Sequence, residues 1–230
     1  LTVWDDYQNR VIAEVDFYAD IAAVRLRRDR IVVALPGSVD VLNFTDLTVV
    51  AHCAAAPAMT PRTLALSQTS DVPIIAFAGD RTATPPPPST TATTATATST
   101  ATTAPSSGAG AGAGAGTEGV LAVRRDLSGH GEGAAAAGAS AAAGVGVPAR
   151  ELVVVPAHNG ALACVALSED GALAATASDK GTLVRVWDTE SGRLVKELRR
   201  GADSAHVWAM CFSRDKTLLA VSSSRGTCHI

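Results

Sequence analysis

The feature that most constrains the fold of this chain is an internal repeat of about 45 residues. Ala161–Gly171 alternates apolar and polar residues and then turns, and Val207–Lys216 does the same, which makes Ser168 and Ser213 equivalent positions 45 residues apart. Short alternating strands at this period, with a Trp187-Asp188 dipeptide in one copy, are typical of β-propeller blades. The sequence therefore predicts an all-β fold, a partial WD-repeat β-propeller.

Further strand patterns extend this repeat along the chain. We expect about three complete blades and parts of two more. The blades fall at residues 1–17, 19–56, 60–80 with 119–126 and 151–156, 158–198, and 206–230. The first residue is not methionine, and both ends fall within strand patterns. We therefore interpret the sequence as a piece of a longer protein.

The middle of the chain has a different composition. Residues 82–107 are almost entirely Thr, Ala, Pro and Ser, and two later stretches are rich in Gly and Ala. Such segments lack large apolar side chains to bury, so conformational entropy favours disorder. The expected organisation is propeller strands at 1–81 and 150–230, one blade strand at 119–127, and disordered inserts at 82–118 and 128–149.

Composition limits the function classes that remain open. The formal net charge is −3, so the chain lacks the overall basic field typical of nucleic-acid binding. No apolar run reaches the ~18 residues that a membrane-spanning helix needs, and no signal peptide opens the chain. There is no GxSxG, P-loop or HExxH motif, so we predict a non-enzymatic protein without metal or cofactor.

Four cysteines are present without a CxxC pair, at Cys53, Cys164, Cys211 and Cys228. Three of them fall in apolar strand patterns, where we expect small buried thiols rather than disulfides or zinc ligands. Free thiols fit a reducing compartment.

Two adjacent arginines, Arg199 and Arg200, close the repeat that contains Trp187-Asp188. Side chains alternate between the two faces of a strand, so an arginine pair on extended backbone points to opposite sides. Each guanidinium is permanently charged and presents a planar fork of donors suited to phosphate oxygens. The pair can therefore anchor two anionic groups side by side.

Leu198-Arg199-Arg200-Gly201 resembles the phenylalanine-arginine-arginine-glycine signature of the PROPPINs, β-propellers that bind phosphoinositides and act in autophagy. Leu198 keeps an apolar anchor at the first position, as in the branch of the family whose signature begins with leucine. The segments that carry the further resemblance are Ala175–Trp187, Val221–Ile230, Val3–Asp6 and Ala23–Val33. The resemblance implies a seven-bladed ring in the whole protein.

The resemblance also implies two phosphoinositide sites on the propeller rim, one on each side of the arginine pair. The first site would contain His158, Ser178, Lys180, Thr182, Arg185 and Arg199. The second would contain Arg200, His206, Ser223, Ser224, Thr227 and His229. Cationic groups would bind phosphate, and hydroxyls would bind inositol oxygens.

The implied function is binding of phosphatidylinositol 3-phosphate and 3,5-bisphosphate by a membrane-recruited scaffold of autophagy. The implied partners are phosphoinositide membranes and the lipid-transfer protein or other factors of autophagy. The implied location is cytoplasmic, peripheral on preautophagosomal, endosomal or vacuolar/lysosomal membranes.

Structural roles remain open for several of these residues. Ser178 and Thr182 can hold a WD repeat together through local hydrogen bonds, His158 can belong to a buried network between strands, and Lys180 and Arg225 can be solvated turn charges. The alternative function is a WD-repeat scaffold that binds protein without lipid. A pure scaffold has no use for two phosphate-binding forks at one blade boundary, which favours the lipid-binding reading.

Two motifs near the N-terminus have simpler interpretations. We expect Leu26–Arg30, which carries three arginines around Asp29, to form a solvated hairpin, with a partner-binding edge as the alternative. We expect Trp4-Asp5-Asp6 to close a blade strand.

Overall fold

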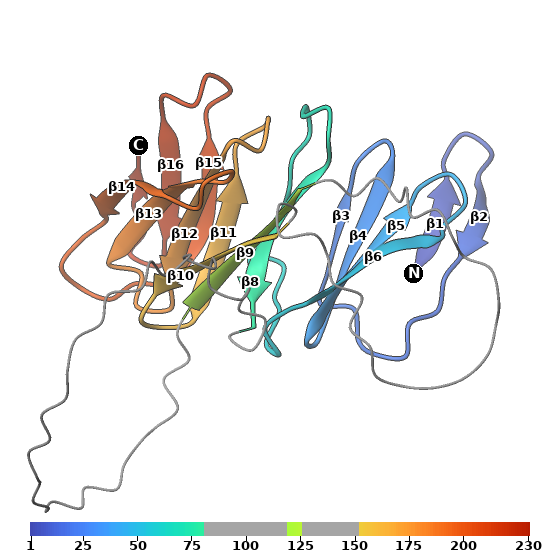
Figure 1. Cartoon of the computed structure of the whole chain (residues 1–230), viewed down its shortest axis with the longest axis horizontal. Coiled ribbons are helices and arrows are strands. Elements are labelled where there is room, and N and C mark those ends of the chain that lie inside the picture. Colours follow the sequence, from blue (N-terminus) through green and yellow to red (C-terminus); the bar gives the residue numbers. More distant parts are fainter. Residues whose placement is uncertain (81–118, 126–151) are drawn as a thin grey trace, which may run out of the picture.

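The computed structural model describes residues 1–80, 119–125 and 152–230, and every regular element in these residues is a β-strand. The strands form five antiparallel sheets that follow one another in chain order and fan out side by side, with the two termini at opposite sides of the arc (Figure 1). The all-β, partial-propeller prediction is confirmed. The inserts expected at 82–118 and 128–149 lie outside the described residues.

The five sheets are numbered here in chain order. The first is a hairpin of β1 (Thr2–Asp5) and β2 (Arg10–Glu14). The second contains β3 (Ala23–Leu26), β4 (Arg30–Leu35), β5 (Ser38–Asn43) and β6 (Val49–Ala54). The third contains β7 (Leu64–Leu66), β8 (Ile74–Gly79), β9 (Gly119–Arg125) and β10 (Leu152–His158). The fourth contains β11 (Leu162–Leu167), β12 (Leu173–Ser178), β13 (Leu183–Asp188) and β14 (Leu194–Arg199). The fifth contains β15 (Val207–Phe212), β16 (Leu219–Ser223) and β17 (Cys228–His229).

Within each sheet the strands pair in chain order. The first strands of successive sheets, β3, β7, β11 and β15, contact one another and form the inner side of the arc. The third sheet joins β8 to β9 although residues 81–118 separate them, so strands on both sides of the low-complexity segment belong to one blade. One boundary differs from the prediction: His158 ends β10 of the third sheet and does not begin the fourth, because it continues the pairing with β9.

The 45-residue repeat recurs in individual hydrogen bonds. In the β11–β12 turn, Ser168 Oγ donates to Asp170 Oδ1 at 2.7 Å and accepts from the Leu173 amide. In the β15–β16 turn, Ser213 Oγ donates to Asp215 Oδ1 at 2.6 Å and accepts from the amide of Leu218. Short polar side chains that bond to nearby backbone stabilise such turns.

Apolar residues fill the space between neighbouring sheets. The layer between the third and fourth sheets includes Leu121, Val155 and Trp187. The layer between the fourth and fifth includes Val184, Val207 and Val221, with Leu198 of the arginine motif packed against it. Burial of these side chains is the main term that holds one blade against the next.

Two expectations about individual residues need correction. Arg27 does not lie in a solvated hairpin, because its side chain is only 4% exposed and pairs with Asp29 at 2.8 Å. Its Nη2 donates to the Ser70 carbonyl at 2.7 Å, so this arginine joins the second sheet to the third. Of the cysteines, Cys53 and Cys164 are buried, whereas Cys211 and Cys228 are exposed, and all four are free.

No helix in the described part of the chain is long and apolar enough to cross a membrane.

Candidate functional site

Arg199 is the last residue of β14, where it pairs with Leu183 at the end of the fourth sheet. Its side chain is exposed, and its guanidinium makes no hydrogen bond or ion pair with the residues that the structure describes. Leu198, on the opposite face of the strand, is packed against the apolar layer shared with the fifth sheet. This packing fixes the strand end and leaves Arg199 available to a ligand.

Arg200 begins the loop that leads to β15, and its side chain is committed to backbone oxygens. Its Nε donates to the Gly181 carbonyl at 2.5 Å, and its Nη2 donates to the Asp203 carbonyl at 2.5 Å. Its amide donates to the Thr182 carbonyl at 2.9 Å. Arg200 therefore ties the 201–206 loop to the β12–β13 turn.

Arg185 lies in the middle of β13 and is paired with a carboxylate. It stands opposite Glu197 of β14 in the sheet register, and its Nε contacts Glu197 Oε2 at 2.7 Å. Its Nη1 donates to the Ala157 carbonyl of β10 at 2.5 Å. The Arg185 side chain therefore lies on the face of the fourth sheet that meets the third.

His158 is buried behind Arg185 in a network between the two sheets. Its Nε2 lies 3.0 Å from Thr176 Oγ1, which also accepts a hydrogen bond from Trp187 Nε1 at 2.8 Å. Burial, followed by the positive charge of Arg185, lowers the pKa of His158 from 6.5 to about 4. The geometry agrees with the structural alternative for His158, because a neutral buried imidazole has little charge to offer a phosphate.

The remaining first-site candidates lie at the β12–β13 turn. Ser178 is buried at the end of β12, Thr182 is partly exposed, and Lys180 is exposed. The Lys180 carbonyl accepts the Ala205 amide at 3.1 Å, which brings the 201–206 loop against this turn. Lys180 and Arg199 are thus the exposed cations of the first set, and Arg185 is the partly covered one.

The second set gathers at the β16–β17 turn, on the other side of the same loop. The His206 amide donates to Ser224 Oγ at 3.0 Å, and Thr227 Oγ1 lies 3.1 Å from His229 Nε2. Ser223 is buried, and its hydroxyl has no hydrogen-bond partner among the described residues. The two sets therefore flank one loop that begins at Arg200.

A groove of about 550 Å³ runs between the fourth and fifth sheets. Arg199, Arg200 and His229 line it, together with an apolar floor that includes Val184 and Leu198. The groove thus adjoins both arginines of the signature and one second-site residue, and Leu198 rather than the Arg199 side chain faces its floor.

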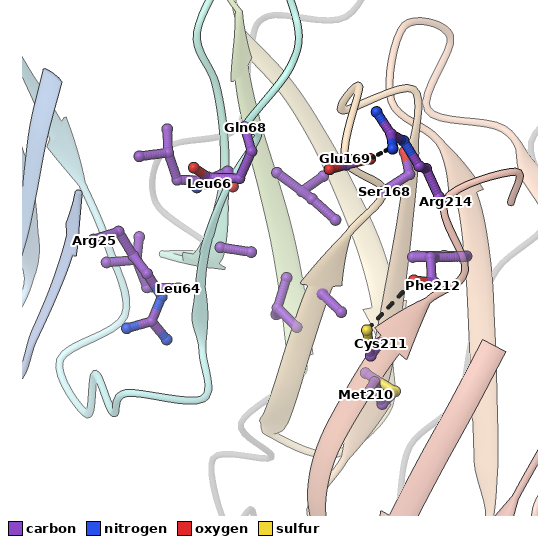
Figure 2. Close-up of a pocket in the computed structure, with 14 residues that line it drawn as sticks. Arg25, Leu64, Leu66, Gln68, Ser168, Glu169, Met210, Cys211, Phe212 and Arg214 are labelled. Carbon is purple, nitrogen blue, oxygen red and sulfur yellow. Dashed lines mark hydrogen bonds and ion pairs between the residues drawn. The ribbon is translucent and has the colours of Figure 1, made fainter. Parts of the chain in front are cut away.

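A second cavity, of about 540 Å³, lies between the inner strands of the arc (Figure 2). Its walls come from β3, β7, β11 and β15, and none of the predicted site residues lines it. Glu169 and Arg214 point toward one another across it, 3.5 Å apart (Figure 2). This internal pairing offsets one of its charges, so the cavity offers a weaker anion site than the arginine motif.

Two residues of this region were not predicted from the sequence. Thr176 contacts His158 and accepts a hydrogen bond from Trp187, and Glu197 is the counter-ion of Arg185. Strand alternation could have placed Glu197 on the same face as Arg199, two residues later. Only the register between β13 and β14 shows that it stands opposite Arg185.

Known proteins resemble this chain in sequence and in fold. Residues 138–230, which contain the arginine motif and both site sets, match the PROPPIN family. The chain is 46% identical over 78 residues to autophagy-related protein 18 of Saccharomyces cerevisiae, a match that covers 34% of this chain and 16% of that protein. It is 27% identical over 231 residues to SVP1-like protein 2 of Emericella nidulans, covering 100% of this chain and 53% of that protein.

The C-terminal part of the chain is therefore similar in sequence to the PROPPIN family. The fold agrees: Hsv2 of Kluyveromyces lactis superposes with a TM-score of 0.66 at 23% identity, covering 99% of this chain and 53% of that one. The chain spans about half the length of SVP1-like protein 2, which it matches from end to end.

Proposed function

We propose that this protein binds phosphorylated inositol headgroups on both sides of the 201–206 loop, which joins the fourth sheet to the fifth. The lipids would be phosphatidylinositol 3-phosphate and 3,5-bisphosphate. The observation that carries the proposal is the exposed Arg199 fork, which has no hydrogen bond or ion pair with the described residues. It lies at the end of a sheet whose β12–β13 turn carries the exposed Lys180, and the 201–206 loop separates it from the second set. A planar guanidinium group can donate two parallel hydrogen bonds to two oxygens of one phosphate, which fixes the position and the orientation of that phosphate.

Two sets of headgroup-binding residues on one rim favour binding to membranes over binding to soluble headgroups. Once one set holds a lipid, the other meets its own headgroup at a high effective concentration, so two weak sites give strong attachment. A relative of this chain is named for autophagy. We therefore propose a scaffold that is recruited from the cytoplasm to preautophagosomal, endosomal or vacuolar/lysosomal membranes and binds autophagy factors there.

The decisive experiment is liposome flotation with phosphatidylinositol 3-phosphate in the vesicles. The double variant Arg199→Thr, Arg200→Thr should lose flotation, and each single variant should lose part of it. Arg199→Thr should leave the melting temperature nearly unchanged, because this exposed side chain makes no hydrogen bond or ion pair with the described residues. Arg200→Thr should lower it slightly, since it removes two hydrogen bonds to backbone.

The matched control is Arg28→Thr with Arg193→Thr, which removes the same charge from exposed positions away from the motif. The control should float like the unmodified protein. If a folded Arg199→Thr, Arg200→Thr variant also floats normally, the lipid-binding proposal fails and a protein-only scaffold becomes the better description.

A further inference from the structure

The first site contains a guanidinium that is already occupied. The side chain of Arg185 is 25% exposed, and it contacts Glu197 Oε2 at 2.7 Å and the Ala157 carbonyl at 2.5 Å. Charge-assisted contacts of this kind are stronger than neutral hydrogen bonds. Arg185 cannot offer its full fork to a ligand while Glu197 holds it.

Glu197 and Arg199 share one face of β14 because they are two residues apart on a strand. Arg185 stands opposite Glu197 on the same face of the neighbouring strand. The three side chains therefore form one patch in which Arg199 is open and Arg185 is paired. A phosphate that reaches Arg199 arrives beside the carboxylate.

The Arg185–Glu197 ion pair is exposed enough for a ligand to replace Glu197. The Glu197 side chain is 42% exposed, so water can solvate the carboxylate when it leaves the guanidinium. A phosphate group carries more negative charge and more acceptor oxygens than a carboxylate. It can therefore take the place of Glu197 on Arg185, at the cost of separating the existing pair.

We propose that Glu197 limits the affinity of the first site: its carboxylate occupies Arg185 and competes with the headgroup phosphate for that guanidinium. This inference rests on the proposed function and concerns a residue of the same site. Glu197 is an affinity-determining residue that acts through Arg185. The site as built is thus weak for a single headgroup and depends on the membrane for strong attachment.

The test is the apparent Kd for phosphatidylcholine vesicles that contain phosphatidylinositol 3-phosphate. Glu197→Gln keeps the shape and a neutral hydrogen bond but removes the competing charge, and it should tighten binding by roughly three-fold, the size expected from one exposed ion pair. Glu190→Gln is the matched control, because it removes the same charge from an exposed turn that does not touch Arg185. The control should bind like the unmodified protein.

A double-mutant cycle separates action through Arg185 from simple repulsion. In an Arg185→Gln background, Glu197→Gln should bring little or no gain, since the guanidinium that it frees is gone. Circular dichroism and melting temperature verify that each variant is folded. Unchanged or weaker binding by Glu197→Gln overturns the inference, and so does a gain that persists in full without Arg185.

These outcomes are distinct from failure of the proposed function. If the unmodified protein does not bind the vesicles, the proposed function is wrong. If it binds and depends on Arg199, but Glu197→Gln has no effect, only the role of Glu197 is wrong.

Discussion

At the scale of single residues, the arginine motif and its surroundings divide into exposed and buried groups. Arg199 and Lys180 face solvent, whereas His158 and Thr176 hold the third and fourth sheets together. His158 is neutral in this setting because burial and Arg185 both disfavour its charged form. The buried imidazole therefore makes the stability of the folded protein depend on pH.

The sign of this dependence follows from proton uptake. In the unfolded chain the imidazole has its ordinary pKa of 6.5, and in the folded protein it has a pKa of about 4. Between these values the unfolded state binds more protons, so stability falls as the pH falls. The contribution of His158 is complete above pH 6.5 and is lost as the pH drops through about 4.

We predict that His158→Gln lowers stability at neutral pH by about 1 kcal/mol, because the bond to Thr176 is weakened. The gap between this variant and the unmodified protein should shrink as the pH falls toward 4, since glutamine has no proton to gain. Melting temperatures measured across this range give the answer. Parallel curves at all pH values would contradict a buried neutral imidazole.

At the scale of elements, two equivalent turns support the candidate site in different ways. Gly181 in the β12–β13 turn and Gly226 in the β16–β17 turn both have positive φ, at 61° and 68°. A Cβ on Gly181 would clash with the Ala205 carbonyl oxygen, whereas a Cβ on Gly226 would meet nothing within 4 Å. The first turn is packed under the 201–206 loop, and the second is open.

These turns make a matched pair of variants. Gly226→Ala should cost about 1 kcal/mol, the price of a left-handed backbone for alanine. Gly181→Ala should cost about 3 kcal/mol, because the clash with the loop adds to the same backbone term. Gly181→Ala should also weaken vesicle binding, since the Gly181 carbonyl anchors Arg200. Denaturant unfolding measures both costs, and equal costs would show that the loop does not rest on the first turn.

At the scale of the whole molecule, the described residues form an arc. The inner strands β3, β7, β11 and β15 follow its curve, and the sheets at its two ends have two and three strands. A complete propeller closes its ring and so protects its strand edges. The arc leaves such edges open on both sides.

We predict that a polypeptide of residues 1–230 alone does not behave as a stable monomer. Unpaired strands at each end of the arc invite self-association, and no contact within the described residues joins the first sheet to the fifth and makes unfolding cooperative. Calorimetry should show a shallow transition, and size-exclusion chromatography should show aggregates. A sharp melt of a monomeric species with full vesicle binding would disprove this.

Much of the fold followed from the sequence, because its physical causes are local. Alternation of apolar and polar residues specified the strands, and the 45-residue spacing of Ser168 and Ser213 specified the repeat. Gly181 and Gly226 occupy equivalent turn positions with similar backbone angles. Even the third sheet, interrupted by residues 81–118, was recognisable from its strand patterns.

The sequence also singled out Leu198-Arg199-Arg200-Gly201, since a paired fork for phosphate is a property of residue type. Its own pattern determined that the chain folds as blades of a propeller and carries two adjacent guanidinium groups at one blade boundary. Only the tertiary structure decided which groups are free. The burial of His158 and Arg27, the pairing of Arg185 with Glu197, and the commitment of Arg200 to backbone oxygens all depend on partners from other strands, turns and sheets. Those partners are brought close by sheet register and blade packing, so no local pattern around each residue records them.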